Sequence, residues 1–311
     1  MSATNKIWAS LVVCAGLILV FKFLFREPVK NEQVIQEFWI EKTHSSQTFD
    51  VAICGDSRIY RGISPNQLEE TLDGALKGIN LGYSSAGYSD EYLDFAVSKL
   101  DKAAPHRILV LGVTPHSLTK EAFKNEHFHS FKDLGPFELF KTRYLSPVLT
   151  YFQVYKPSNV IRGSKETFLE DYHEDGWVAS SRINADTSEA LASYQKIFSG
   201  YQVEAAEVNS FLEKVSKLTA NGVQVVAFRP PTTAAMRAME DSLSGFDEAF
   251  VQAELQKRSV TWVELRPSDF ESYDGSHLHH NSAKELSRII GLRLKELYLA
   301  SSENPKNNVV E

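Results

Sequence analysis

The sequence lacks the features that would place it in several large classes of protein. Its 311 residues carry a formal net charge of −7 and no basic block, which argues against a nucleic-acid partner. Only two cysteines are present: Cys14 lies in an apolar N-terminal run and Cys54 lies in a predicted buried strand. We therefore expect no disulfide between them, and cysteine usage does not identify the cellular compartment.

Recognisable metal-binding patterns are also missing. The segments 127–129 and 172–175 contain histidines and carboxylates, but neither has a recognised ligand spacing. We therefore predict no metal site and no cofactor. Hydrophobic residues make up 43% of the chain and charged residues 23%, so an ordinary globular core is expected.

A long apolar run lies at the N-terminus, from Ile7 to Phe25. These roughly nineteen residues could cross a bilayer as a helix if Lys22 extends toward the headgroups. An uncleaved anchor over residues 1–30 is favoured over a signal peptide, because the small residues of a typical cleavage site are missing after the run. Cys14 is a poor lipid-attachment site, since it lies inside the run and follows Val13.

Charges around this run bear on its orientation. Lys6 lies on one side, whereas Lys22, Arg26 and Lys30 lie on the other. By the positive-inside rule this distribution would keep the following domain in the cytoplasm. The family resemblance described below favours the opposite side of the membrane.

The rest of the chain alternates between strand and helix patterns, after a connector at 31–49 that is helical around Asn31–Glu41. We predict five buried parallel strands: Asp50–Cys54, Lys77–Leu81, Arg107–Gly112, Val223–Phe228 and Thr261–Leu265. Helices are predicted at Pro65–Leu72, Glu91–Leu100, Ala205–Thr219, Phe246–Lys257 and Ala283–Tyr298. Because right-handed crossovers place helices on both faces of a parallel sheet, the fold class is α/β, a three-layer α/β/α sandwich over residues 50–300.

One stretch departs from the alternation. Residues 114–203 are rich in aromatic side chains and contain no convincing strand, so we predict a helical insertion. Insertions of this length are often functional, and this one is either a cap over a cleft or additional packing. The polar tail 301–311 is expected to be disordered.

Two short motifs more than two hundred residues apart supply the parts of a hydrolase site. The first is Gly55-Asp56-Ser57-Arg58, directly after a predicted strand, where a serine hydroxyl lies at the rim of a sheet. In the second, His277 follows Asp274 by three residues, so that the carboxylate can orient the imidazole that accepts the serine proton. Each motif alone also has a structural explanation, the first as a turn and the second as a helix cap.

The combination and order of these motifs favour the catalytic interpretation, and they resemble the SGNH, or GDSL-type, hydrolase superfamily. The match covers roughly residues 50–112 and 222–299. The resemblance implies a flavodoxin-like fold with a five-stranded parallel sheet. It also implies that Ser57 is the nucleophile, Asp274 the acid and His277 the base, with the Ser57 N–H in the oxyanion hole. Asp56 is expected to fix the turn.

The other two blocks of the family depart from its pattern. The glycine of the second block aligns with Ser85, and Gly87 is close enough to be the donor instead. In the third block Thr114 stands where the family has an asparagine that completes the oxyanion hole. Losing such a donor commonly costs about a hundred- to a thousandfold in turnover, so a slow enzyme, or one that uses His116 or an insertion residue, is expected.

Arginines near the motifs are candidates for substrate binding. Arg58 follows the predicted nucleophile, and Arg61 lies three residues further on. Arg229 follows the fourth strand, at the sheet edge where ligands bind. For Arg58 and Arg61 the alternative is that they are surface arginines, which pair with carboxylates on the next helix.

Taken together, the anchor and the variant blocks resemble a membrane-tethered branch that O-acetylates exopolysaccharides or D-alanylates cell-wall polymers. This resemblance implies an extracytoplasmic esterase or O-acyltransferase, acting on an acylated glycan or small ester, with a possible membrane acyl-transfer partner. The alternative is a catalytically weak domain of the same type that binds polysaccharide or scaffolds a membrane assembly. An intracellular lipid or thioester hydrolase is a third hypothesis, if the domain is cytoplasmic.

Overall fold

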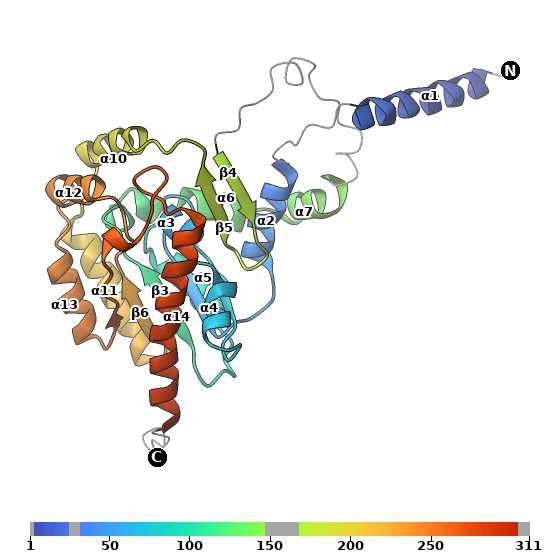
Figure 1. Cartoon of the computed structure of the whole chain (residues 1–311). Coiled ribbons are helices and arrows are strands. Elements are labelled where there is room, and N and C mark those ends of the chain that lie inside the picture. Colours follow the sequence, from blue (N-terminus) through green and yellow to red (C-terminus); the bar gives the residue numbers. More distant parts are fainter. Residues whose placement is uncertain (1–2, 25–31, 147–167, 304–311) are drawn as a thin grey trace. The chain divides into compact units, whose positions relative to one another are not determined.

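The computed structural model describes residues 3–24, 32–146 and 168–303, and it divides the chain into two compact units (Figure 1). The first unit comprises Met1–Glu41 and Asp133–Glu166. The second comprises Lys42–Lys132 and Thr167–Glu311, and it contains all the predicted site residues.

A five-stranded parallel sheet forms the centre of the second unit. Strand β1 (Val51–Cys54) lies between β2 (Gly78–Asn80) and β3 (Ile108–Gly112), and β6 (Gln224–Phe228) and β7 (Thr261–Trp262) follow on the β3 side. Every neighbouring pair is parallel. The predicted α/β class and the five predicted strands are thus confirmed, although the strands are shorter than the sequence pattern indicated.

The register of the sheet brings the carboxyl ends of its strands to one edge. Cys54 pairs with Leu111, and Gly112 pairs with Phe228. The turns that follow β1, β3 and β6 therefore start side by side. These turns carry Ser57, Thr114 and Arg229, so the sheet brings the three segments to one edge.

Helices flank this sheet (Figure 1). They are α3 (Ser57–Gly62), α4 (Pro65–Thr71), α5 (Asp90–Ser98), α11 (Ala205–Ala220), α12 (Ala234–Leu243), α13 (Glu248–Lys257) and α14 (His280–Glu303). On α14 the buried residues Ala283, Leu286, Ile290 and Leu294 recur at helical spacing and join the main apolar core. The sequence pattern predicted these helices except α3 and α12.

The segment 114–203 contains strands that the sequence pattern did not predict. Strands β4 (Phe168–Tyr172) and β5 (Val178–Arg182) form an antiparallel pair, and Gly176 has a φ of +86° in the turn between them. The prediction that this segment has no strand is therefore wrong. The described helices of the segment in this unit are η1 (His116–Leu118), η2 (Ala122–Lys124), α6 (Glu126–Lys132) and α10 (Ser188–Gly200).

The first unit contains the apolar helix α1 (Ala3–Leu24), most of α2 (Glu32–His44), α7 (Pro136–Phe140) and the π-helix η3 (Lys141–Leu145). Residues 3–20 of α1 have a mean hydropathy of 1.7 and none of them is buried. This helix is apolar and long enough to be a membrane anchor or a signal sequence. The ends of the predicted anchor (1–2 and 25–30) and most of the predicted tail (304–311) lie outside the described residues.

Candidate active site

The turn after β1 sets the position of Ser57 at the start of α3. Gly55 has a φ of +152°, and a Cβ there would lie 2.4 Å from the Ile59 side chain, so the turn requires glycine. Asp56 caps α3 by accepting a hydrogen bond of 2.9 Å from the Arg58 N–H through Oδ1. The half-buried Ser57 is thereby held at the carboxyl edge of the sheet, and Asp56 does fix the turn as the sequence indicated.

A second turn, between β7 and α14, shapes the segment that carries Asp274 and His277. Gly275 has a φ of +91°, and Asp274 Oδ1 accepts hydrogen bonds from the N–H groups of Ser276 (2.9 Å) and His277 (2.7 Å). This arrangement folds the segment back on itself. It leaves the second carboxylate oxygen, Oδ2, free to meet the imidazole.

The structure brings the three predicted catalytic side chains together in one hydrogen-bonded chain. Asp274 Oδ2 lies 2.7 Å from His277 Nδ1, and His277 Nε2 lies 2.8 Å from Ser57 Oγ. Both distances are within the range of good hydrogen bonds. The chain links residues 220 positions apart in the sequence.

The charges of this chain suit proton transfer. Burial alone would raise the pKa of Asp274, but the hydrogen bonds from the His277 side chain and the local N–H groups outweigh it and lower that pKa to about 2. Burial lowers the pKa of His277, an effect opposed by Asp274 and aided by Arg61 and Arg58. At neutral pH, an ionised Asp274 therefore accepts a hydrogen bond from the Nδ1–H of a neutral His277, whose Nε2 lone pair faces the Ser57 hydroxyl.

The hydroxyl of Thr114, the residue expected at the asparagine position of the third block, bonds to other groups of the protein. Its Oγ1 donates a hydrogen bond of 2.7 Å to Asp56 Oδ2 and accepts one of 3.0 Å from the Ser117 N–H. A hydroxyl has one proton, so Thr114 could donate to an oxyanion only if its bond to Asp56 broke. In this arrangement, Thr114 supports the cap of α3.

The second-block donors differ in availability. The Gly87 N–H donates to Asn125 Oδ1 at 3.0 Å and is therefore occupied. Ser85 has a φ of +53°, a left-handed conformation that glycine adopts most easily. Within the described part of the chain, the N–H groups of Ser57 and Ser85 donate no hydrogen bond, so they are the available pair among the predicted donors.

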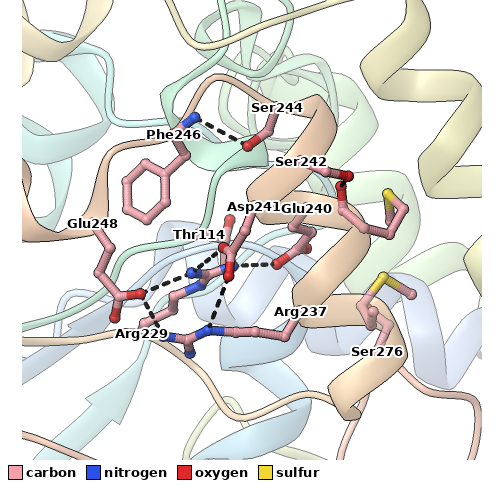
Figure 2. Close-up of polar contacts among 12 residues, drawn as sticks. Thr114, Arg229, Arg237, Glu240, Asp241, Ser242, Ser244, Phe246, Glu248 and Ser276 are labelled. Carbon is pink, nitrogen blue, oxygen red and sulfur yellow. Dashed lines mark hydrogen bonds and ion pairs between the residues drawn. The ribbon is translucent and has the colours of Figure 1, made fainter.

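Arg229 lies in a cluster of carboxylates rather than at an open site (Figure 2). Its Nη1 lies 2.7 Å from Asp241 and 2.8 Å from Glu248, and its Nη2 lies 2.9 Å from Glu240. The Arg229 side chain is only 2% exposed. The guanidinium predicted to bind substrate is thus engaged by ion pairs inside the protein, which the sequence analysis did not predict.

Arg58 shares the same central carboxylate. Its Nη2 lies 2.6 Å from Glu240 Oε1, and its Nε donates to Ser276 Oγ at 3.0 Å. Although burial raises the pKa of Glu240, the guanidinium groups of Arg58 and Arg229 outweigh it and hold that pKa below its usual value. A fully buried, ionised Glu240 therefore links the turn after β1 to the turn after β6.

Sequence reasoning missed Glu240, because it missed the helix that carries it. The available signal was the spacing of Met236, Met239 and Glu240, which places the carboxylate on the buried face of α12. An acidic residue on an apolar helix face indicates a buried cationic partner. No group of three or more His, Cys, Asp or Glu side chains within 3–24, 32–146 and 168–303 is placed to hold a metal ion.

Comparisons with known proteins give similarities to solved structures and no match to a family model. No protein-family model matches the chain, and no curated protein matches it. Among solved structures, the chain is similar to a "putative platelet activating factor" from Streptococcus pneumonia, with 11% sequence identity and a TM-score of 0.35. The similarity covers 85% of this chain and 92% of that one.

Proposed function

We propose that this protein is a serine esterase or O-acyltransferase of the SGNH type, with Ser57, His277 and Asp274 as its catalytic triad. The observation that carries the proposal is the hydrogen-bonded chain from Asp274 through His277 to Ser57, with distances of 2.7 and 2.8 Å. The order of the two motifs also agrees with that family. So does the strand order β2-β1-β3-β6-β7, which corresponds to the flavodoxin-like three-layer arrangement.

In the proposed reaction, Ser57 Oγ attacks the acyl carbonyl carbon while its proton moves to His277 Nε2. The carbonyl electron pair moves onto oxygen, and the resulting tetrahedral intermediate collapses when the alkoxide leaves with the proton from His277. Water or an acceptor hydroxyl then gives its proton to His277 and attacks the acyl carbon, and the second tetrahedral intermediate collapses as His277 returns the proton to Ser57 Oγ. Asp274 holds the imidazole in the required tautomer and balances its charge throughout.

The oxyanion in this reaction is held by backbone groups. Among the predicted donors, the N–H groups of Ser57 and Ser85 donate to no acceptor in the described part of the chain. Two donors rather than three correspond to a weaker hole, because one donor is commonly worth about a hundred- to a thousandfold in turnover. We therefore expect slow turnover of simple esters.

We further propose that α1 anchors the protein in a bilayer, with the catalytic unit outside the cytoplasm. The length and mean hydropathy of α1 support the anchor, and the resemblance to polysaccharide O-acetylation and cell-wall D-alanylation proteins supports the extracytoplasmic side. An acylated glycan or related surface molecule is then the substrate. A membrane acyl-transfer protein would be its partner in the transferase case.

Labelling with a fluorophosphonate tests the proposal on the full-length chain in detergent. Wild type is expected to be labelled, whereas Ser57→Ala and His277→Ala are expected not to be. Ser98→Ala is the matched control, since Ser98 lies at the end of α5 and its hydroxyl donates to the Phe95 carbonyl. Wild-type protein that is folded yet unlabelled would contradict the triad assignment.

The second candidate is a catalytically weak domain that binds polysaccharide or scaffolds a membrane assembly. It is favoured by one observation, the engagement of Thr114 with Asp56 and of Gly87 with Asn125, which reduces the available oxyanion donors. Exposed rings in the first unit, at Phe137, Phe140 and Tyr144, could stack on sugars. This function predicts glycan binding that survives Ser57→Ala, together with no labelling of wild type.

A further inference from the structure

Two arginines on α3 reach the segment that carries the acid and the base, one on each side of Asp274. Arg58 Nε donates to Ser276 Oγ at 3.0 Å, and Arg61 Nη1 donates to the Tyr273 hydroxyl at 2.8 Å. Residues three apart share one face of a helix, so a single short helix that begins with Ser57 makes both bonds. We infer that Arg58 and Arg61 position residues 273–277 against Ser57 and so set the proposed triad geometry. This inference rests on the proposed function.

A buried ion pair with Glu240 fixes the guanidinium of Arg58 that donates to Ser276. Arg58 Nη2 lies 2.6 Å from Glu240 Oε1, and the two side chains are 2% and 0% exposed. An ion pair removed from water has few alternative geometries, because any movement leaves a buried charge without its partner. Arg58 therefore has little freedom to move, and Ser276, adjacent to His277, is fixed with it.

The Arg61 bond is held in a comparable way on the other side. Arg61 Nη2 lies 2.8 Å from Glu170 Oε1 on β4, and its Nε donates to the Tyr60 hydroxyl at 3.1 Å. Tyr273, which accepts the third bond, lies nearly parallel to the His277 ring with 6.0 Å between ring centres. The face of the imidazole is therefore set by a ring that Arg61 holds in place.

This arrangement gives both arginines a use that the sequence did not predict. Arg58 was a candidate for substrate binding, but its Nε and Nη2 bind Ser276 and Glu240. The unpredicted helix α12 supplies Glu240, and the unpredicted strand β4 supplies Glu170. Both elements thus bear on the triad through an arginine, without contact with the reacting atoms.

Two conservative variants test the positioning role in the full-length protein in detergent. Ser276→Ala removes the acceptor of Arg58 Nε, and Tyr273→Phe removes the acceptor of Arg61 Nη1 while keeping the ring beside His277. Each is expected to slow fluorophosphonate labelling about tenfold, and the double variant about a hundredfold, because small misplacements of catalytic groups have large effects on rate. The labelling rate is measured on protein shown by circular dichroism to be folded.

Matched controls remove the same groups elsewhere. Ser287→Ala deletes a fully buried serine hydroxyl on α14 that accepts from the Ser64 N–H. Tyr201→Phe deletes a phenol hydroxyl from a tyrosine that is 45% exposed, at the C-terminal end of α10. Both controls are expected to be labelled within about twofold of the wild-type rate, since neither hydroxyl belongs to the bonds that Arg58 and Arg61 make, and distant sites act independently.

A pH profile separates positioning from general support of the fold. The charged groups that act on His277 are Asp274, Arg61 and Arg58, with the neutral ring of Tyr273 beside it. Arg58→Lys keeps the charge but cannot bond to both Ser276 and Glu240, so labelling should slow. The pH at which the labelling rate falls on the acid side should stay unchanged. Arg58→Gln should also slow labelling, and it should move this acid-side fall to higher pH, because a cation that lowers the pKa of His277 is gone.

The outcomes distinguish this inference from the proposal on which it depends. An unlabelled wild type would overturn the proposed function and this inference with it. A labelled wild type together with Ser276→Ala and Tyr273→Phe at the wild-type rate would overturn the positioning role alone. If the Arg58 variants do not fold, the two conservative variants still decide.

Discussion

The two halves of the candidate site differ in where their hydrogen bonds lead. On the proton-transfer side, the bonds of Asp274 and His277 converge on Ser57 Oγ. On the oxyanion side, the Thr114 hydroxyl and the Gly87 N–H bond to other groups of the protein, Asp56 and Asn125. The first half is complete in its side chains, whereas the second depends on backbone N–H groups.

This difference teaches that a well-formed triad does not by itself indicate fast turnover. The triad activates the nucleophile, but the oxyanion donors stabilise the charge that develops in the transition state. A chain with a complete first half and a reduced second half should therefore react readily with an activated phosphonate and slowly with an ordinary ester. The predictions below test each half in turn.

The largest effect is expected on the proton-transfer side, from Asp274→Asn. An amide in place of the carboxylate favours the wrong imidazole tautomer, and the comparable change in serine proteases lowers turnover about ten-thousandfold. The labelling rate and the hydrolysis of p-nitrophenyl acetate should both fall by about that factor. Asp247→Asn is the matched control, since Asp247 caps α13 by accepting a hydrogen bond from the Phe250 N–H. A loss of less than about tenfold would remove Asp274 from the triad.

The pH dependence tests the same half. Because the neutral form of His277 accepts the proton, labelling should be present above the pKa of His277 and be lost as the pH falls through it. Burial lowers that pKa below 6.5, and Asp274, with a pKa of about 2, stays ionised across this range. Labelling rates between pH 4 and 8 should thus have a midpoint below about 6.5. A midpoint above that value would contradict a buried, neutral His277.

A smaller effect is expected on the oxyanion side, from Thr114→Val. The change leaves Asp56 Oδ2 and the Ser117 N–H without their partner, so the free energy of unfolding should fall by about 1–3 kcal/mol. Labelling per folded molecule should change by less than about threefold, far below the effect of a lost oxyanion donor. Thr119→Val, which removes another buried hydroxyl, is the control for stability. A hundredfold slower hydrolysis at unchanged stability would make Thr114 an oxyanion donor.

The same division describes what the sequence could predict. The strands, the class of fold and the residues of the proposed triad were predictable, because hydrophobic runs mark buried strands and the two motifs have fixed internal spacing. The pairing of Ser57 with His277 was predicted from the combination and order of the two motifs. The oxyanion side was less predictable, since the direction of a hydroxyl such as Thr114 depends on which acceptor lies nearest in the folded chain.

The local sequence pattern could not predict which charged residues pair in the protein interior. Glu240 and Arg58 are 182 positions apart, and no local spacing relates them. The short helix α3 has six residues, too few for a helical periodicity to be recognised. Strand β4 escaped prediction because its half-exposed residues, with Glu170 and Asp171, do not form an apolar run. Long-range ion pairs and short elements are thus the parts that required the structure.

The smallest effect is expected from Ser85→Gly, which sharpens the comparison on its weaker side. Glycine keeps the N–H and relieves a left-handed conformation that costs a serine about 1 kcal/mol, so stability should rise by up to that amount. Labelling should stay within about twofold of wild type, since the proposed donor is the backbone. Asn184→Gly, at a φ of +62°, is the control, and its gain should be smaller because asparagine tolerates this region. If Ser85→Gly instead slows labelling about tenfold while the protein stays folded, the serine hydroxyl rather than its N–H serves the site, and the oxyanion half has a side-chain donor after all.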